Sequence, residues 1–371
     1  MRIAQIVGSI DPHIGGKERF VRELAEELTE LGHDVTLITC DPTSKTDIGC
    51  DVGYVRSSRI PGLPEIPSPR DLIKHLRSTF DICHLHYHAL FGEMVGLVCK
   101  KLSRTLITTI HDEMKRRTHK VMYDRLLLHT TSHLSHRIIC LTEGMKRALV
   151  RRGLDGQKVV VIPNAMHVKE LQTQARRLDN SEDPGVEFDL LFVGRLEYRK
   201  GAQCLLRALS LLDKNGFRPT LKIVGEGVYK HKLMSLAKDN DLSSQAVFTG
   251  YISQKELLKS YLNARCVVIP SLYEGTPNRV AIEALALGKP IITTSIPGME
   301  AISSRRLGFS VPPGDCDTLA RAIREVLCIG DEKLRRAKSA GKSFAEQHDW
   351  SRIIEQIVHE YCDCCKNTRG D

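Results

Sequence analysis

The chain has 371 residues, more than a single hydrophobic core usually serves, so its length predicts two domains. With 42% hydrophobic and 27% charged residues, the composition is that of a globular protein and excludes a wholly disordered one. The net charge of +9 is compatible with nucleic acid, an anionic membrane surface or phosphorylated substrates, and does not by itself choose among them.

Neither a membrane span nor a secretory leader is evident. The longest near-apolar stretch, "HALFGEMVGLVC", is short and contains Glu93, and "MRIAQIVGSI" runs straight into a strand pattern. We therefore expect a cytoplasmic protein whose twelve cysteines are reduced structural thiols. The tail cluster of Cys362, Cys364 and Cys365 leaves a metal site or a lipid attachment as an alternative.

Strand and helix patterns alternate through residues 1–167, the predicted first domain. "RIAQIVG" is typical of a strand, and "GGKERFVRELAEELTELGH" of a helix whose apolar face runs from Phe20 to Leu31 and which stops at Gly32. Further strands are predicted in "DVTLITC", "DICHLHYH", "RTLITTIH", "HRIICLT" and "KVVVIPN". Such continuous apolar runs indicate parallel strands covered by helices on both faces.

A second series follows residues 168–187, a polar stretch that we interpret as the interdomain linker. Residues 188–347 hold strand patterns separated by helical ones: "DLLFVG", "TLKIVG", "AVFTG", "CVVIP" and "PIITT". Residues 348–371 form a separate amphipathic helix. The predicted fold class is therefore α/β, with two Rossmann-like, doubly wound domains that face each other across a cleft and bind ligands at the carboxyl ends of their strands.

The segment "FVGRLEYRKGAQCLLRAL" predicts an anion site. A strand ends at Gly194, a short loop holds Arg195 and Lys200, and a helix begins near Gly201. A helix N-terminus offers unpaired N–H groups and about half a positive charge, which together with two cations favours a diphosphate. Two solvated surface cations are the alternative.

Two glutamates flank the turn in "PSLYEGTPNRVAIEALALGKP". Carboxylates near a phosphate site make sense if they accept hydrogen bonds from neutral hydroxyls, such as those of a ribose and a hexose. We place Glu283 in the first turn of the following helix, where the helix dipole favours a negative charge. A helix-capping acid and a surface acid, Glu274, are the alternative.

Two features of the first domain point to the carboxyl edge of its sheet. In "SIDPHIGGKERF", Gly15 and Gly16 permit close approach of a ligand to the helix N-terminus. His111 follows the strand "RTLITTI". The alternating histidines of "HLHYH" either line the cleft rim or form a metal site; they are His84, His86 and His88.

Taken together, these segments resemble the retaining family 4 glycosyltransferases of GT-B fold. The resemblance rests on "GGKERFVRELAEELTELGHDVTLIT", "DICHLHYH", "TLITTIHDE", "IICLTEGMKRAL", "VVVIPNA", "LLFVGRLEYRKG", "LKIVGEG", "VFTGYIS", "VIPSLYEGTPNRVAIEALALGKPIITT" and "GFSVPPGD". It implies transfer of a hexose, with retention, from a UDP- or GDP-sugar to a lipid-linked or saccharide acceptor. No metal and no cofactor are expected.

The resemblance also implies residue roles. The catalytic positions are His111, beside the transferred sugar, and Glu274, which contacts that sugar without acting as a nucleophile. The donor-binding positions are Gly16 and Arg195 with Lys200 at the diphosphate, and Glu283 at the ribose. The final helix, which carries Trp350, is expected to cross back to the first domain.

One departure from the family pattern concerns the paired glutamates. Eight residues separate Glu274 from Glu283, where the family usually has seven. An extra residue inside the helix would rotate one glutamate by about 100°. We assign the extra residue to the turn around Thr276 and Pro277, because "RVAIEALALGKP" matches the family's helix without a gap.

Three alternatives remain open: a GT-B epimerase or phosphorylase, a non-catalytic protein that binds sugar nucleotides, and a nucleic-acid-binding protein. No nucleic-acid-binding motif is recognised, so we expect no nucleic acid partner. Residues 99–125 carry a dense basic run that predicts peripheral attachment to an anionic membrane, with a solvated loop as the alternative. The run comprises Lys115, Arg116, Arg117, His119 and Lys120. The sequence identifies neither the donor base, nor the sugar, nor the acceptor.

Overall fold

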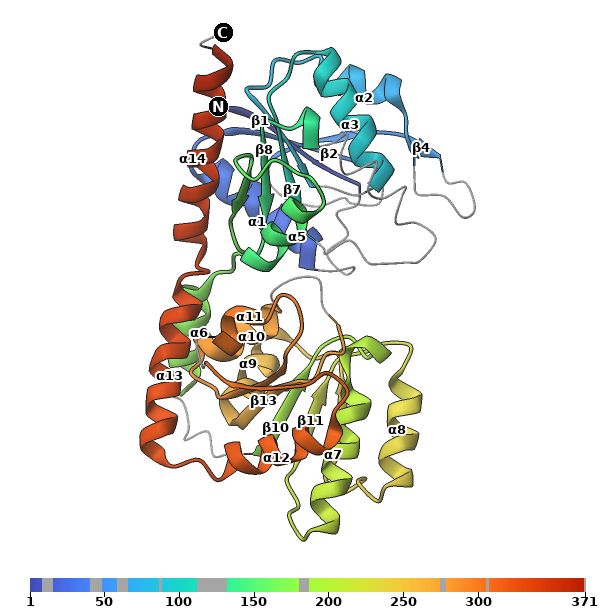
Figure 1. The fold of residues 1–371 in the computed structure, drawn as a ribbon, viewed down its shortest axis with the longest axis vertical. Coiled ribbons are helices and arrows are strands. Elements are labelled where there is room, and N and C mark those ends of the chain that lie inside the picture. The colour runs from blue at the N-terminus through green and yellow to red at the C-terminus, as the bar shows by residue number, and fades with distance from the viewer. Residues whose placement is uncertain are drawn as a thin grey trace. The chain divides into compact units, whose positions relative to one another are not determined.

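The computed structural model describes residues 1–8, 16–40, 49–58, 66–86, 89–111, 132–179, 187–273, 278–304 and 307–369. The chain divides into two compact units (Figure 1). Unit 1 comprises Met1–Ala165 and Trp350–Asp371, and unit 2 comprises Met166–Asp349.

Unit 1 is built on a seven-stranded parallel sheet, among the described residues, in the order β3-β2-β1-β6-β7-β8-β9. Its strands are β1 (Arg2–Val7), β2 (Asp34–Thr39), β3 (Asp51–Tyr54), β6 (Ile82–His86), β7 (Leu106–Ile110), β8 (Arg137–Cys140) and β9 (Val159–Val161). A small antiparallel pair, β4 (Ser57–Ser58) and β5 (Ile66–Pro67), stands outside this sheet. The strand order reverses between β1 and β6, which is where ligands bind in doubly wound sheets.

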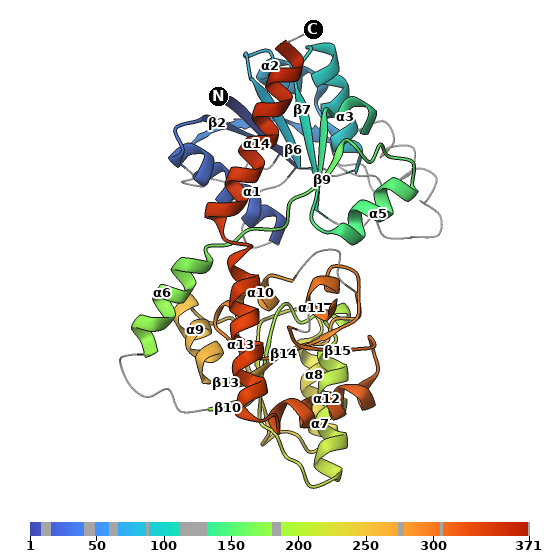
Figure 2. The same ribbon diagram turned by 60° about the vertical axis from the view of Figure 1, so that its left-hand side comes forward.

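Helices cover both faces of this sheet. One face packs against α1 (Gly16–Glu30) and α14 (Trp350–Arg369), which run beside each other in Figure 2, and the other against α2 (Pro69–Leu76) and α3 (Ala89–Lys101). A further helix, α5 (Glu143–Arg151), packs on β8 and β9. The predicted stop at Gly32 is confirmed by its φ of +79°, but Leu31 was wrongly assigned to the buried face: it lies beyond the helix and is 55% exposed.

Unit 2 contains a six-stranded parallel sheet, among its described residues, in the order β12-β11-β10-β13-β14-β15. The strands are β10 (Phe188–Val193), β11 (Leu221–Val224), β12 (Ala246–Gly250), β13 (Ala264–Ile269), β14 (Ile291–Thr294) and β15 (Phe309–Val311). This is the Rossmann order, and it reverses between β10 and β13.

Two helical layers complete unit 2. One face of the sheet packs against α7 (Ala202–Lys214), α8 (Lys230–Asp239) and α12 (Cys316–Leu327). The other packs against α6 (Val168–Asp179), α9 (Gln254–Asn263), α10 (Arg279–Ala286) and α13 (Asp331–Glu346). The short α11 (Glu300–Ser304) follows β14, and the 3-10 helix η1 (Tyr198–Lys200) precedes α7. The predicted α/β class with two Rossmann-like domains is confirmed.

The predicted linker at 168–187 is wrong for its first part. Residues 168–179 form α6, whose Val168, Leu171 and Ala175 are buried in the core of unit 2. The apolar residues of this helix are few and lie on one face, so the mostly polar segment was mistaken for a linker. The second unit accordingly begins at Met166 and ends at Asp349, instead of spanning 188–347.

The expectation of uniformly reduced cysteines is also contradicted. Cys204 and Cys316 form a disulfide in unit 2, with their Cα atoms 5.2 Å apart. They lie 112 positions apart in the sequence and meet only because α7 packs against α12, so no local pattern could pair them. Within the tail cluster, Cys364 is buried and Cys365 packs on the same core of unit 1.

Candidate functional site

The loop after β10 carries the predicted phosphate-binding residues of unit 2. Arg195, 47% exposed, places its Nη1 3.2 Å from Oε1 of Glu197, and Arg199 donates from Nε to Oε2 of Glu197 at 2.7 Å. Burial raises the pKa of Glu197, but the Arg199 hydrogen bond and the charges of Arg199, Arg195 and Lys200 outweigh it and lower the pKa overall. Glu197 therefore holds an ordered cluster of cations, which the sequence analysis had reduced to two.

Gly201 fixes the position of this loop. It has φ +76°, ends η1 and caps α7, and a Cβ added to it would lie 1.8 Å from the carbonyl oxygen of Pro270. The amide of Leu272 donates to the carbonyl oxygen of Arg199 at 2.8 Å. The loop after β10 is therefore packed directly against the loop after β13, at the point where the strand order reverses.

A third loop, after β11, joins this edge and was given no role by the sequence analysis. A Cβ on Gly225 would lie 2.0 Å from the Gly194 carbonyl oxygen, and the amide of Leu196 donates to the Glu226 carbonyl oxygen at 2.7 Å. Val228 stands 95% exposed at its tip. The signal for this loop was the glycine pair in "VGEG", which permits the close backbone approach.

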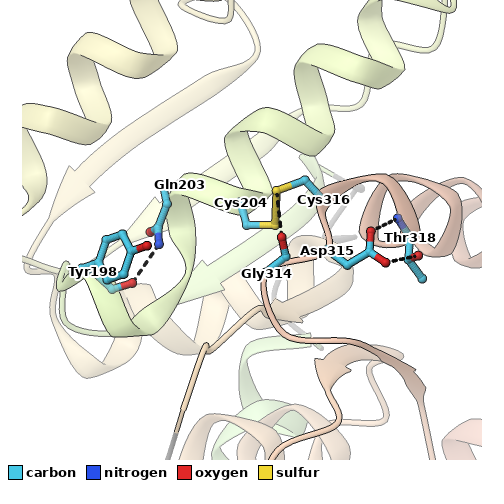
Figure 3. The surroundings of a disulfide bond; sticks show 7 residues. All are labelled: Tyr198, Gln203, Cys204, Gly314, Asp315, Cys316 and Thr318. Atoms are coloured by element: carbon cyan, nitrogen blue, oxygen red, sulfur yellow. Dashed lines mark hydrogen bonds between the residues drawn. A yellow bond between two sulfur atoms is a disulfide. The ribbon is translucent and has the colours of Figure 1, made fainter.

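The N-terminal ends of α7 and α12 are tied together beside the loop after β10 (Figure 3). Cys204 stands in the first turn of α7 and Cys316 is the first residue of α12. Gln203 donates from Nε2 to the Tyr198 carbonyl oxygen at 2.9 Å, which links the same turn of α7 back to η1. The start of α7 is thus held from two sides.

Glu283 lies in the second turn of α10, and its predicted place in the first turn is wrong. The helix begins at Arg279 after the N-cap Asn278, whose side chain accepts from the amide of Val280. Glu283 is 8% exposed, accepts a hydrogen bond from the Tyr261 hydroxyl at 2.7 Å and pairs with Arg279 at 3.4 Å. Its carboxylate keeps further lone pairs available, but the first-turn dipole argument does not apply.

The rest of the paired-glutamate segment is outside the described residues. Glu274 lies there, with Thr276 and Pro277, where the extra residue was assigned. Within its bounds, α10 runs without interruption from Arg279 to Ala286.

Unit 1 gathers its histidines at the carboxyl edge of its sheet. His84 and His86 point from β6 toward the face covered by α1 and α14, and His111 follows β7. His86 Nδ1 lies 2.9 Å from His111 Nε2. Phe20 of α1 packs edge-on against His111, with ring centroids 5.4 Å apart. His88 is outside the described residues.

These contacts decide against a metal site at His84 and His86. Both nitrogens of each ring have hydrogen-bonding partners within the protein. Burial lowers the pKa of His84 to about 3 and the pKa values of His86 and His111 well below their usual range. In the part of the chain that the structure describes, no group of three His, Cys, Asp or Glu side chains could hold a metal ion.

The predicted residues thus fall into two sets. In unit 1, Gly16 is the first residue of α1, one turn before Phe20, and His111 lies against Phe20. In unit 2, Arg195 and Lys200 share one loop. Each set lies at the carboxyl edge of its own sheet.

The remaining surface predictions stay open. The basic run of residues 115–120 is outside the described residues. Among the described helices, none combines the length and apolar character needed to cross a bilayer. In the tail, burial raises the pKa of Cys364 to about 11, which keeps it a thiol in the core.

Two family models match this chain. The model described as Glycosyl transferases group 1 matches residues 175–344, and the model described as Glycosyltransferase Family 4 matches residues 14–170. The two matches lie on successive segments that correspond closely to the two units of the structure.

Relatives of full length are found as well. An uncharacterised glycosyltransferase of Methanocaldococcus jannaschii is 28% identical over 97% of this chain and 98% of its own length. The D-inositol 3-phosphate glycosyltransferase of Pseudarthrobacter chlorophenolicus is 28% identical, over 94% of this chain and 90% of its own.

Among solved structures, Anabaena HepE in complex with UDP has a TM-score of 0.80 at 18% identity, covering 98% of this chain and 100% of HepE. Its complex with UDP-glucose has a TM-score of 0.77 at 19% identity, covering 98% of this chain and 100% of HepE. These likenesses show that the fold is shared.

Proposed function

The chain belongs to the family 4 glycosyltransferases of GT-B fold, and on that premise we propose that it transfers a hexose from a nucleotide sugar, with retention of anomeric configuration. The donor is a UDP- or GDP-sugar and the acceptor is a saccharide or a lipid-linked sugar. The observation that carries this proposal is the cationic loop from Gly194 to Gly201, packed at the strand-order reversal of unit 2.

The loop supplies what a diphosphate leaving group requires. Arg195 and Lys200 bring positive charge, and the α7 N-terminus adds the positive end of the helix dipole. Glu197 orients Arg195 and Arg199 before a ligand arrives, which reduces the conformational entropy that binding must remove. This charge arrangement stabilises a leaving diphosphate without calling on a metal ion.

The remaining residues are assigned to the sugar and the ribose. Glu274 accepts hydrogen bonds from the transferred sugar without forming a covalent bond, and Glu283, already held by Tyr261, accepts from the ribose. His111 lies beside the transferred sugar, and Gly16 lets the α1 N-terminus approach the diphosphate. Attack by the acceptor on the face that the diphosphate leaves gives retention.

Two relatives support the choice of substrates. The HepE structures contain UDP and UDP-glucose, so a protein of this fold holds a nucleotide sugar. A D-inositol 3-phosphate glycosyltransferase of matching length supports transfer to a polyhydroxylated acceptor. Peripheral attachment to an anionic membrane would bring the protein to a lipid-linked acceptor, and is proposed on the basic run alone.

The test is titration calorimetry with a panel of UDP-, GDP- and ADP-sugars. Arg195→Ala and Lys200→Ala should each weaken binding of the preferred donor by about 1.5 kcal/mol, near the lower limit for hydrogen bonds to charged groups because Arg195 is half exposed. Arg218→Ala is the matched control, because it removes the same charge from a residue that pairs with Asp213 at the opposite end of α7. Equal affinities in all three variants would remove the loop from the donor site.

Metal independence has its own test. Transfer from the preferred donor should continue in excess EDTA. Loss of activity with EDTA and its recovery with Mg²⁺ or Mn²⁺ would overturn that part of the proposal. Donor binding without transfer to any saccharide or lipid-linked acceptor would instead favour the non-catalytic alternative.

A further inference from the structure

A chain of buried polar side chains leads from His111 to the C-terminal helix. His111 Nε2 lies 2.9 Å from His86 Nδ1, and His86 Nε2 lies 2.7 Å from Gln5 Oε1. The Gln5 amide nitrogen donates to the Tyr361 hydroxyl at 3.0 Å, and that hydroxyl lies 2.5 Å from His84 Nδ1. His111 is 5% exposed, and the other members named are fully buried. These hydrogen bonds join β1, β6 and the residue after β7 to α14.

The rings in this chain are neutral. Burial lowers the pKa of His86 and His111 well below their usual range, and the charge of Lys17 lowers both further. A neutral imidazole carries one N–H and one lone pair, so the role of one nitrogen fixes the role of the other. Hydrogen-bond direction can therefore be followed from ring to ring.

The Gln5 amide sets the direction. Its Nε2 can only donate and does so to Tyr361, so its Oε1 faces His86 Nε2, which must carry the proton. His86 Nδ1 is then an acceptor, and the His111 nitrogen opposite it, Nε2, must be the donor. By elimination, Nδ1 of His111 holds a lone pair.

We propose that Gln5, His86 and Tyr361 are positioning residues that hold His111 in its Nε2–H form, so that Nδ1 accepts a hydrogen bond from a substrate hydroxyl. The inference that the hydroxyl belongs to a sugar rests on the proposed function. The ring state itself does not, because it follows from contacts within unit 1.

The position of His111 suits this role. It follows the last residue of β7 at the carboxyl edge of the sheet, and Phe20 supports its ring from the side. No hydrogen bond to Nδ1 is made within the described residues. A lone pair accepts from a hydroxyl but not from a carbonyl or phosphate oxygen, so His111 discriminates in favour of hydroxyl-bearing groups.

The decisive measurement is long-range ¹⁵N–¹H NMR of the histidine rings in the full-length, ligand-free protein. His136 is an internal reference, because its Nδ1 accepts from the Leu106 amide at 3.1 Å and that amide can only donate. We expect His111 to match His136, with a protonated Nε2 and an unprotonated Nδ1. A protonated Nδ1 on His111 would overturn the proposal.

Tyr361→Phe tests the hydrogen bonds that hold the His111 ring in its Nε2–H form. It removes the hydroxyl that accepts from the Gln5 amide nitrogen, so the Gln5 amide group can rotate and exchange its oxygen and nitrogen positions. His111 should then populate both neutral forms, and kcat should fall about tenfold with KM little changed. The control is Ile354→Val, which perturbs the packing of the same helix without touching the chain of hydrogen bonds. An unaltered His111 spectrum and unaltered kcat in Tyr361→Phe would refute the role of Tyr361.

The two proposals fail separately. If His111 has the expected ring state but no nucleotide sugar supports transfer, the proposed function fails and the positioning of His111 stands. If transfer is observed and Nδ1 of His111 is protonated, the positioning of His111 fails and the proposed function stands.

Discussion

Gly201→Ala should destabilise the loop after β10, although the substitution adds only a methyl group. Gly201 has φ +76°, so any other residue there pays for a left-handed backbone, at about 1 kcal/mol. In addition, the new Cβ would lie 1.8 Å from the Pro270 carbonyl oxygen, a rigid backbone atom. Relieving such an overlap typically costs about 1–3 kcal/mol. We therefore expect a loss of about 2–4 kcal/mol.

Gly216→Ala separates the cost of the left-handed backbone from the cost of the steric overlap. Gly216 lies just beyond the other end of α7 with φ +72°, and a Cβ added there meets nothing within 4 Å. It should cost only the backbone term, about 1 kcal/mol. In a unit of this size 1 kcal/mol lowers Tm by about 2–4 °C, so Gly201→Ala should melt well below Gly216→Ala.

The assays are thermal unfolding and calorimetry with the preferred nucleoside diphosphate. Gly201→Ala should lose both stability and affinity, because the loop moves away from the strand-order reversal, whereas Gly216→Ala should keep its affinity. Equal Tm values for the two variants, with nucleotide binding intact in both, would refute the close packing of the loops after β10 and β13.

Three further outcomes are expected. Cys204→Ser should lower the stability of unit 2 by about 4–5 kcal/mol through loss of a long cross-link, while Cys328→Ser at an exposed free thiol should not; equal Tm values would argue against the Cys204–Cys316 bond. Because His84 is neutral when folded, with a pKa of about 3, and charges when unfolded, stability should fall as pH drops below about 6.5, by about 1 kcal/mol per pH unit; a flat Tm between pH 7 and 5 would contradict this. A variant with Glu at Lys115, Arg116, Arg117 and Lys120 should no longer co-sediment with anionic vesicles but should still bind nucleotide. If the wild-type protein does not bind such vesicles at low salt, membrane attachment is refuted.

Periodicity predicted some elements better than others. Long, strongly patterned segments such as β1 and α1 were found where expected, because an apolar face of that length has few alternatives to burial. The strands β3 and β15 were missed because "DVGY" and "FSV" are too short to carry a pattern. Helix α6 was mistaken for a linker because its few buried residues are diluted by charged ones.

The sequence by itself determined the family, the α/β class and the loop that holds Arg195 and Lys200, because these depend on local runs of residues with a characteristic order. Only the tertiary structure decided which distant groups meet. The hydrogen bond of Tyr261 to Glu283, and those of Tyr361 to His84 and Gln5, depend on packing between separate elements. A buried hydrogen bond needs a partner within about 3 Å, and that distance is set by how helices and strands pack, which no spacing along the chain records.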